Sequence, residues 1–391
     1  MTGKERILTA LAGGQADATP VAIDYMTLYL AERVERAYVA AYRERLAREG
    51  RIRIDPDEDV QIRAKATLEA YGCFQERHDW LQVSGAPSRE VLSQRELRLT
   101  DGQVFELDRA AGTRRQMLLS GQAAKTEEMR DRFERTRRRS LERDQLDKIL
   151  AEHSAQTRVA RGDLRQVEAL VRQKGEDYFV YTGASAPFWW LYDLLGFEDM
   201  MLALHDAPQL AFTIMDASLE ATVEHAQAFK DAGGHGIRVE ECLASADMIS
   251  QKMYERFVLP YEEQLFSQLR RMGLKTILYF CGDVMPRLTA LRQLPIDALM
   301  VEESKKTFTI DIEEVRATIG PDLCLLGNID SYAMVQKGTR AELSAEVARQ
   351  IRVAGADGGF ILGVGSPLPL DTPPERADLL VRFARQYTPG D

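Results

Sequence analysis

The sequence predicts an α/β fold, a (β/α)8 or TIM barrel in which eight parallel strands alternate with helices. Short apolar runs recur along the chain, and each is followed by a turn and a helical pattern. Acidic residues stand at the ends of several different runs, and no glycine-rich turn follows the first one. We therefore favour the barrel over an open, doubly wound sheet.

The candidate strands are short, continuous and apolar, as expected of strands that are covered on both faces. In chain order they are residues 20–25, the less regular region around 73–80, and residues 177–183, 236–241, 275–282, 298–303, 323–329 and 359–365. Apolar residues at three- and four-residue steps, with glycine at or near the end, predict helices between them. The clearest helical segments are residues 208–234, 249–275 and 340–359.

Residues from about 40 to 150 depart from this alternation. Residues 93–120 alternate about Asp101 and Gly102, a pair that favours a tight turn between antiparallel strands, so this part predicts a β-hairpin. We expect residues 1–391 to form a single barrel domain, with the segment of about 40–150 inserted as a helical and β-hairpin lid or edge region.

The composition limits the class of protein. With 45% hydrophobic and 29% charged residues, the chain resembles an ordinary globular protein, and none of its apolar runs reaches the roughly 18 residues of a membrane span. Residues 1–20 read as an amphipathic helix and not as a secretory signal. The four cysteines form no CxxC pair, which indicates reduced thiols. We expect a cytoplasmic protein.

The charge disfavours a nucleic-acid partner, because the formal net charge is −10 and phosphate binding depends on clustered Lys and Arg. The basic cluster Arg137–Arg139 is interleaved with acids at helical spacing, so we interpret it as a solvated helix face.

Polar residues follow most of the predicted strands. In a parallel barrel the carboxyl ends of the strands form one rim, so at least five carboxylates are expected to meet there. Crowded carboxylates repel one another and raise their pKa values unless a cation or a donor neutralises them, which suits acid–base chemistry or a metal. The alternative is that many of these acids cap the following helices. The residues concerned are Asp24, Tyr25, residues 181–185, Glu240, Glu241, Cys242, Tyr279, Cys281, Asp283, Glu302, Glu303, Asn328, Asp330 and Ser366.

Cysteine is the most distinctive ligand at this rim. None of the five histidines falls at a strand end, so a bound metal would have to use Cys281, Cys242 and Glu241 or another acid. A lone cysteine such as Cys281 is also typical of a small buried side chain. Trp189, within the aromatic stretch 187–192, predicts either helix packing or an apolar wall for a flat ligand.

Several motifs in the same order resemble the uroporphyrinogen decarboxylase superfamily, which contains decarboxylases and cobalamin-linked methyltransferases. The resemblance covers the two ends and most of residues 177–391, and it is weak across about 40–150. The motifs are the opening MTGKERILTALAGGQADATPV, then APFWWLYDLLGFEDMM, ADMISQKMYERFVLPYEEQL, YFCGD, LLGNID and the closing GGFILGVGSPLPLDTPPE.

Departures from the motifs of both branches shape the functional hypothesis. The decarboxylase branch implies an Arg-Gln-Ala-Gly-Arg motif after the first strand, where this chain has AIDYMTLYLAERV, so a polyanionic porphyrin fits poorly. The methyltransferase branch implies His-x-Cys-Gly and a later Cys as zinc ligands. Here Cys281 and Gly282 match, whereas Tyr279 and Ser366 stand at the places of the other two ligands.

The resemblance therefore implies a methyltransferase that moves a methyl group between a cobalamin, free or on a corrinoid protein, and a small acceptor or donor. It also makes a homodimer plausible. The alternatives are a decarboxylase or lyase on a less anionic substrate, and a non-catalytic corrinoid- or tetrapyrrole-binding subunit. We assign catalysis to Glu240, Glu241, Glu302, Glu303 and Tyr279; substrate binding to Asp24, Tyr181, Trp189, Asn328, Asp330 and Ser366; and a metal such as zinc to Cys281, Glu241 and Cys242.

Overall fold

The computed structural model, which describes residues 1–117, 146, 148, 151 and 154–387, confirms the barrel. Eight parallel strands are hydrogen-bonded in the order β1-β12-β11-β10-β9-β8-β7-β3. Each lies within or directly beside one of the predicted runs. They are β1 (Val21–Ala22), β3 (Trp80–Gln82), β7 (Phe179–Ser185), β8 (Gly236–Glu241), β9 (Lys275–Phe280), β10 (Ala298–Val301), β11 (Cys324–Leu326) and β12 (Phe360–Gly363).

The junction between β1 and β3 closes the ring through Asp79. The backbone N–H of Asp79 donates to the carbonyl of Val21 over 2.8 Å, and the N–H of Val21 donates to the Asp79 carboxylate over 2.7 Å. Asp79 is buried and is also paired with Arg385 and Arg6. A side chain thus replaces part of the backbone ladder at this seam.

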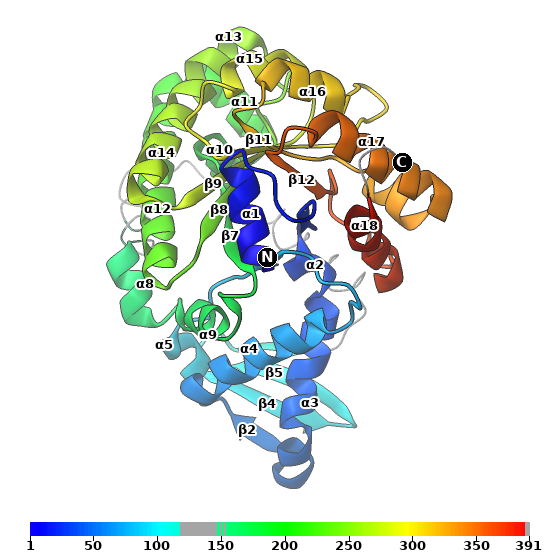
Figure 1. The fold of residues 1–391 in the computed structure, drawn as a ribbon. Helices are drawn as coiled ribbons and strands as arrows, with labels where there is room; N and C mark the ends of the chain where they lie inside the picture. Colours follow the sequence, from blue (N-terminus) through cyan, green and yellow to red (C-terminus); the bar gives the residue numbers. More distant parts are fainter. Residues whose placement is uncertain (118–145, 147, 149–150, 152–153, 388–391) are drawn as a thin grey trace.

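Side chains that alternate along each strand divide the core into two layers. The interior layer contains Trp80, Tyr181 and Tyr279, and α1 (Gly3–Leu11) closes it at the amino end with Ile7 and Leu11. Figure 1 shows α1 in the middle of the ring of helices. The outer layer packs strands against helices.

Helices follow the strands and cover the outside of the barrel (Figure 1). Their apolar faces join the outer core layer, as the periodic segments predict. They are α8 (Ala155–Arg161), α9 (Arg165–Lys174), α10 (Pro187–Leu195), α11 (Phe197–Asp206), α12 (Pro208–Asp231), α13 (Gln251–Met253), the π-helical turn Tyr254–Val258, α14 (Leu259–Met272), the 3-10 turn Met285–Arg287, α15 (Leu288–Leu291), α16 (Ile312–Ile319), the π-helical turn Ser331–Gln336, α17 (Arg340–Ala354) and α18 (Pro374–Gln386).

A second sheet lies beside the barrel. It is antiparallel, in the order β2-β4-β5-β6, and it has its own apolar core with α3 and α4. β4 and β5 pair across the predicted turn, where Asp101 and Gly102 both have positive φ, as a tight hairpin requires. The elements of this region are α2 (Met26–Tyr29), α3 (Ala31–Glu49), β2 (Arg51–Arg53), α4 (Pro56–Tyr71), α5 (Arg89–Ser93), β4 (Arg95–Thr100), β5 (Gln103–Asp108) and β6 (Thr113–Gln116).

The division into one domain with a lid stays a prediction. The cluster Arg137–Arg139, interpreted above as a solvated helix face, lies outside the described residues. In the described part of the chain, every helix is too short or too polar to span a bilayer.

Candidate functional site

The carboxyl end of the barrel holds most of the predicted site residues, and strand geometry decides which of them meet. On β8, Ile237 and Val239 pack in the outer core layer, so Arg238 and Glu240 point into the barrel. Glu241 has the same orientation as Val239 and points toward the helices. Two adjacent glutamates at one strand end therefore lie on opposite faces of the sheet.

A buried ion pair lies beneath the rim. The Nε atom of Arg238 is 3.1 Å from Oδ2 of Asp24, and the Tyr181 hydroxyl donates to Oδ1 of Asp24 over 2.6 Å. Burial raises the pKa of Asp24, and the Arg238 guanidinium partly offsets that rise. Burial alone would lower the pKa of Arg238, but Asp24 and the other acidic groups around it hold that pKa well above its usual value. Asp24 and Tyr181, two of the six predicted substrate residues, are therefore used within this buried network.

Above this pair, Glu240 connects the barrel interior to two thiols. Nη1 of Arg238 donates to Oε2 of Glu240 over 3.3 Å. The hydroxyl of Tyr25 donates to Oε1 of Glu240, and so does the Cys242 thiol, over 3.3 Å. The carboxylate of Glu240 is thereby fixed between a guanidinium, a phenol and a thiol.

The ligand atoms of Glu240, Cys242 and Cys281 all lie within 4.8 Å of one another, and each residue is partly exposed. Hydrogen bonding to Cys281 and then burial raise the pKa of the Cys242 thiol. Two sulfurs and one carboxylate oxygen are a donor set that zinc accepts, and three protein ligands leave a fourth position open, as in catalytic zinc sites. Elsewhere in residues 1–117 and 154–387, no set of three His, Cys, Asp or Glu ligand atoms comes this close.

The carboxylate that lies beside the two thiols is that of Glu240 and not that of Glu241, which was predicted as the ligand. Glu241 is buried on the other face of β8, where its Oε1 accepts the N–H of Leu243 over 3.0 Å. Burial first, and then the nearby carboxylate of Glu262 on α14, raise the pKa of Glu241 to about 8. Neither a catalytic nor a metal-binding role fits a glutamate that faces the helix layer.

Glu302 and Glu303 form a second acidic group, next to Cys281. Oε2 of Glu302 accepts the N–H of Gly282 over 2.8 Å, and the Ser366 hydroxyl donates to Oε1 of Glu302 over 3.1 Å. Lys305 pairs with both glutamates.

Lys305 is the neutralising cation of this group. Burial raises the pKa of Glu303 and Lys305 lowers it, so the lysine offsets part of that rise. Sequence reasoning did not select Lys305, although its position two and three residues after these acids was a usable signal.

Tyr279, like Ser366 described above, has a side-chain hydroxyl that already donates a hydrogen bond within the protein. The hydroxyl of Tyr279 donates to the carbonyl of Gly365 over 2.6 Å, and its ring meets that of Tyr25 edge-on, 6.0 Å between centroids. The close approach at Gly365 requires glycine, since a Cβ there would come within 2.3 Å of the Glu303 backbone nitrogen. The Tyr279 proton is thus directed at the backbone and not at the open rim.

Three other predicted substrate residues have structural roles. The amide nitrogen of Asn328 donates to the backbone carbonyl of Glu302 over 3.1 Å, and its oxygen accepts from Gln350 over 3.2 Å. Asp330 accepts two backbone N–H groups and caps the turn Ser331–Gln336. Trp189 packs against the outer core layer and Tyr192. Capping and packing, the alternatives raised from the sequence, therefore explain Asp330 and Trp189.

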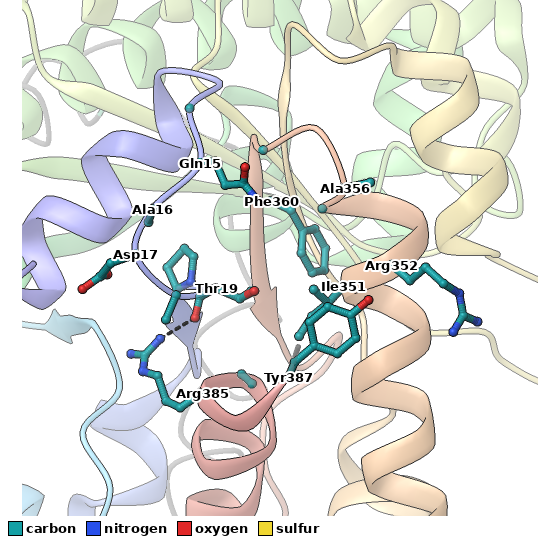
Figure 2. A pocket seen from close by; sticks show the side chains of 16 residues that line it. Gln15, Ala16, Asp17, Thr19, Ile351, Arg352, Ala356, Phe360, Arg385 and Tyr387 are labelled. Carbon is teal, nitrogen blue, oxygen red and sulfur yellow. Dashed lines mark hydrogen bonds between the residues drawn. The ribbon is translucent and has the colours of Figure 1, made fainter. Parts of the chain in front are cut away.

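A cavity of about 370 Å³ lies at the opposite, amino end of the barrel (Figure 2). It is lined by the loop before β1, by the ends of α17 and α18, and by Phe360 at the start of β12. Arg385 closes one side by donating to the carbonyl of Thr19. None of the predicted site residues lines this cavity, and the amino end of such barrels serves stability, so the carboxyl rim is the better candidate.

Comparison with known proteins gives the family context. The family model described as uroporphyrinogen decarboxylase (URO-D) matches residues 141–387. The chain is 23% identical to the methylcobamide:CoM methyltransferase MtbA of Methanosarcina mazei over 253 residues, which are 62% of this chain and 68% of that protein. It is 26% identical over 202 residues to a uroporphyrinogen decarboxylase of Neisseria meningitidis, covering 50% of this chain and 54% of that one.

Two further relatives come from Methanosarcina mazei. A methylated-thiol–coenzyme M methyltransferase is 26% identical over 202 residues, 52% of each chain. The chain thus spans only about half the length of two of these three curated relatives. A solved structure described as a methyltransferase superposes with a TM-score of 0.66 at 20% identity, over 98% of both chains, and supports the fold.

Proposed function

Because the chain belongs to the uroporphyrinogen decarboxylase family, we propose that it is an enzyme that transfers a methyl group between a corrinoid and a small acceptor or donor. The observation that carries this proposal is the cluster of Glu240, Cys242 and Cys281 at the carboxyl rim, whose ligand atoms lie within 4.8 Å. Similarity to two methyltransferases of Methanosarcina mazei supports the same class of reaction.

The cluster fits a zinc ion, which Glu240, Cys242 and Cys281 would hold while its fourth position stays open. A zinc ion in such a site lowers the pKa of a bound thiol or water, and a corrinoid carries the methyl group. The protein's own contribution is to fix Glu240 through Arg238 and Tyr25, so that this carboxylate cannot turn away from the thiols.

Proton handling is assigned to the second acidic group. Glu303 is 6% exposed and lies beside Lys305, so it can hold a proton or release one while the lysine balances its charge. Glu302 is tied to Gly282 and Ser366, which makes it the positioning member of the pair. The predicted catalytic role of Glu303 is kept in this proposal, whereas Glu302, predicted as catalytic, and Ser366, predicted to bind substrate, become positioning residues.

The test combines metal analysis of the purified chain with the visible spectrum of added methylcobalamin. We expect about one zinc per chain, and demethylation of methylcobalamin when an acceptor is supplied. Carbon dioxide release from a carboxylated substrate, without change in the corrinoid spectrum, would favour a decarboxylase instead. Tight corrinoid binding without turnover would favour a binding subunit.

A further inference from the structure

A separate cavity of about 300 Å³ lies between the barrel and the helices α3, α4 and α9. Gln82, Val83 and Ser84, at the carboxyl end of β3, form one wall, and Met26 and Thr27, after β1, form another. The volume is at the lower end of the range in which proteins bind small molecules, roughly 300–1,000 Å³. Glu240, Cys242 and Cys281 are not among the lining residues, so this cavity is distinct from the rim cluster.

Tyr25 connects the cavity to the rim. Its backbone adopts the left-handed conformation, with φ of 56°, which costs a residue with a side chain on the order of 1 kcal/mol. This bend sends the Tyr25 hydroxyl to Glu240, while the next two residues, Met26 and Thr27, turn into the cavity wall. Tyr25 therefore contacts Glu240 and directly precedes two residues of the cavity wall.

The walls of the cavity are largely apolar, and the charges on them are paired. Of the described residues that line it, Glu35 and Arg63 are the charged ones. Arg63 is paired with Asp59 and lies over the ring of Tyr38, 4.5 Å from its centroid. Glu35 is paired with Arg115 over 2.6 Å. An ion placed here would find no uncompensated partner, so the cavity suits an uncharged ligand.

One polar group gives the cavity a direction. The side-chain oxygen of Gln82 accepts only a long contact of 3.5 Å from the Thr27 N–H, which leaves its amide able to pair with a ligand. Gln82 lies at the carboxyl end of β3, where the cavity meets the barrel. The Tyr71 hydroxyl on the facing helix is sealed from solvent, so it is not open to a ligand.

We propose that this cavity binds the organic body of the enzyme's small substrate, and that this body is an uncharged aromatic or branched aliphatic group with one hydroxyl or carbonyl that pairs with Gln82. Its place in turnover rests on the proposed function. Binding itself does not, because it needs neither metal nor corrinoid.

The test is isothermal titration of the full chain, without added corrinoid, with two probes of similar size. 4-Methylphenol is uncharged, and 4-hydroxybenzoate carries a carboxylate in place of the methyl group. We expect 4-methylphenol to bind with a Kd on the order of 0.1–1 mM, and 4-hydroxybenzoate to bind at least about tenfold more weakly. Equal or tighter binding of the anion, or no saturable binding of 4-methylphenol, would overturn the proposal.

Variants locate the binding. Val34→Phe places a ring in the cavity from its partly exposed edge, and Gln82→Leu removes the amide; each should weaken 4-methylphenol about tenfold or more. Ala40→Phe adds the same ring to the exposed face of the same helix and should bind as the parent does. Circular dichroism identifies a variant that fails to fold, in which case the other variant decides. Unchanged binding in the folded variants contradicts the assignment.

The proposed function and the assignment of this cavity can be disproved independently of each other. If 4-methylphenol binds as expected but methylcobalamin is never consumed, the proposed function is wrong and the cavity remains a ligand site. If methylcobalamin is consumed but 4-methylphenol does not bind, the assignment of this cavity is wrong and the proposed function stands.

Discussion

The guanidinium of Arg238 lies inside the barrel, with its Nε atom 3.1 Å from the carboxylate of Asp24, and both side chains are almost fully buried. Asp24 follows β1, and Arg238 belongs to β8, which is not a neighbour of β1 in the sheet, so the contact crosses the barrel interior. Arg238 reaches Glu240 with a second nitrogen. The pair therefore anchors the carboxylate of the proposed metal site to the floor of the barrel.

Replacing Arg238 should lower the free energy of unfolding. Arg238→Met leaves the buried Asp24 carboxylate without its cation, and breaking a buried pair in this way typically costs about 3–5 kcal/mol. We expect the free energy of unfolding in urea to fall by that order. The double variant with Asp24→Asn should recover part of the loss, because the unpaired charge is then removed. A single variant as stable as the parent would show that the pair is not formed.

Metal binding should depend on two cysteines and not on a third. Cys242→Ser and Cys281→Ser each remove a thiolate ligand, so zinc content should fall from about one per chain to a small fraction of that. Cys73→Ser is the control, because Cys73 is also a free, partly exposed thiol but belongs to the loop after α4. Equal zinc in all three variants would place the metal elsewhere.

Stability should depend on pH through Glu241 and Glu262. Burial is the main cause that raises the pKa of Glu241 to about 8 and that of Glu262 to about 7. Both values lie above the ordinary value of 4.5, so the folded state holds protons that the unfolded chain releases. The contribution to stability is complete below about pH 4.5 and is lost as the pH rises to about 8, on the order of a few kcal/mol.

The variant Glu262→Gln isolates this effect. It keeps a neutral side chain at every pH, so the fall in stability between pH 5 and 8.5 should be smaller than in the parent, as measured by urea unfolding at each pH. Glu220→Gln, at an exposed position of α12, should retain the parent's pH dependence. If Glu262→Gln and the parent respond identically to pH, these carboxyls are not protonated in the folded state.

Lys305 should set the proton affinity of Glu303. The lysine lowers the pKa of this glutamate, so Lys305→Met should raise it. We expect the acidic limb of the pH–rate profile of methyl transfer to move to higher pH. Lys306→Met removes the neighbouring exposed lysine and should leave the limb in place. The same shift in both variants would mean that only the general loss of positive charge matters.

The alternation of apolar runs with amphipathic segments carried the fold prediction. A barrel strand lies in or directly beside each of the eight predicted runs, because a parallel sheet covered by helices buries short apolar segments on both faces. The turn at Asp101 and Gly102 could also be predicted directly from the sequence, because few residue pairs accept positive φ in succession. The rim also follows from the sequence, because parallel strands bring all their carboxyl ends to one side.

What the sequence could not determine was the direction in which each rim residue points. Glu240 and Glu241 are indistinguishable by residue type, and strands with apolar residues on both faces give no polar alternation from which to read the inside. Asn328 and Asp330 looked equally available, yet neighbouring backbone groups use their side chains.

The sequence by itself determined the barrel, the rim and the set of residue types available there. Only the tertiary structure decided that Glu240, Cys242 and Cys281 converge, that Glu241 is buried behind them, and that Arg238 and Lys305 supply the compensating cations. The physical reason is that partners in a site are chosen by three-dimensional proximity between strands, and the period-two geometry of a strand separates even adjacent residues by the full thickness of the sheet.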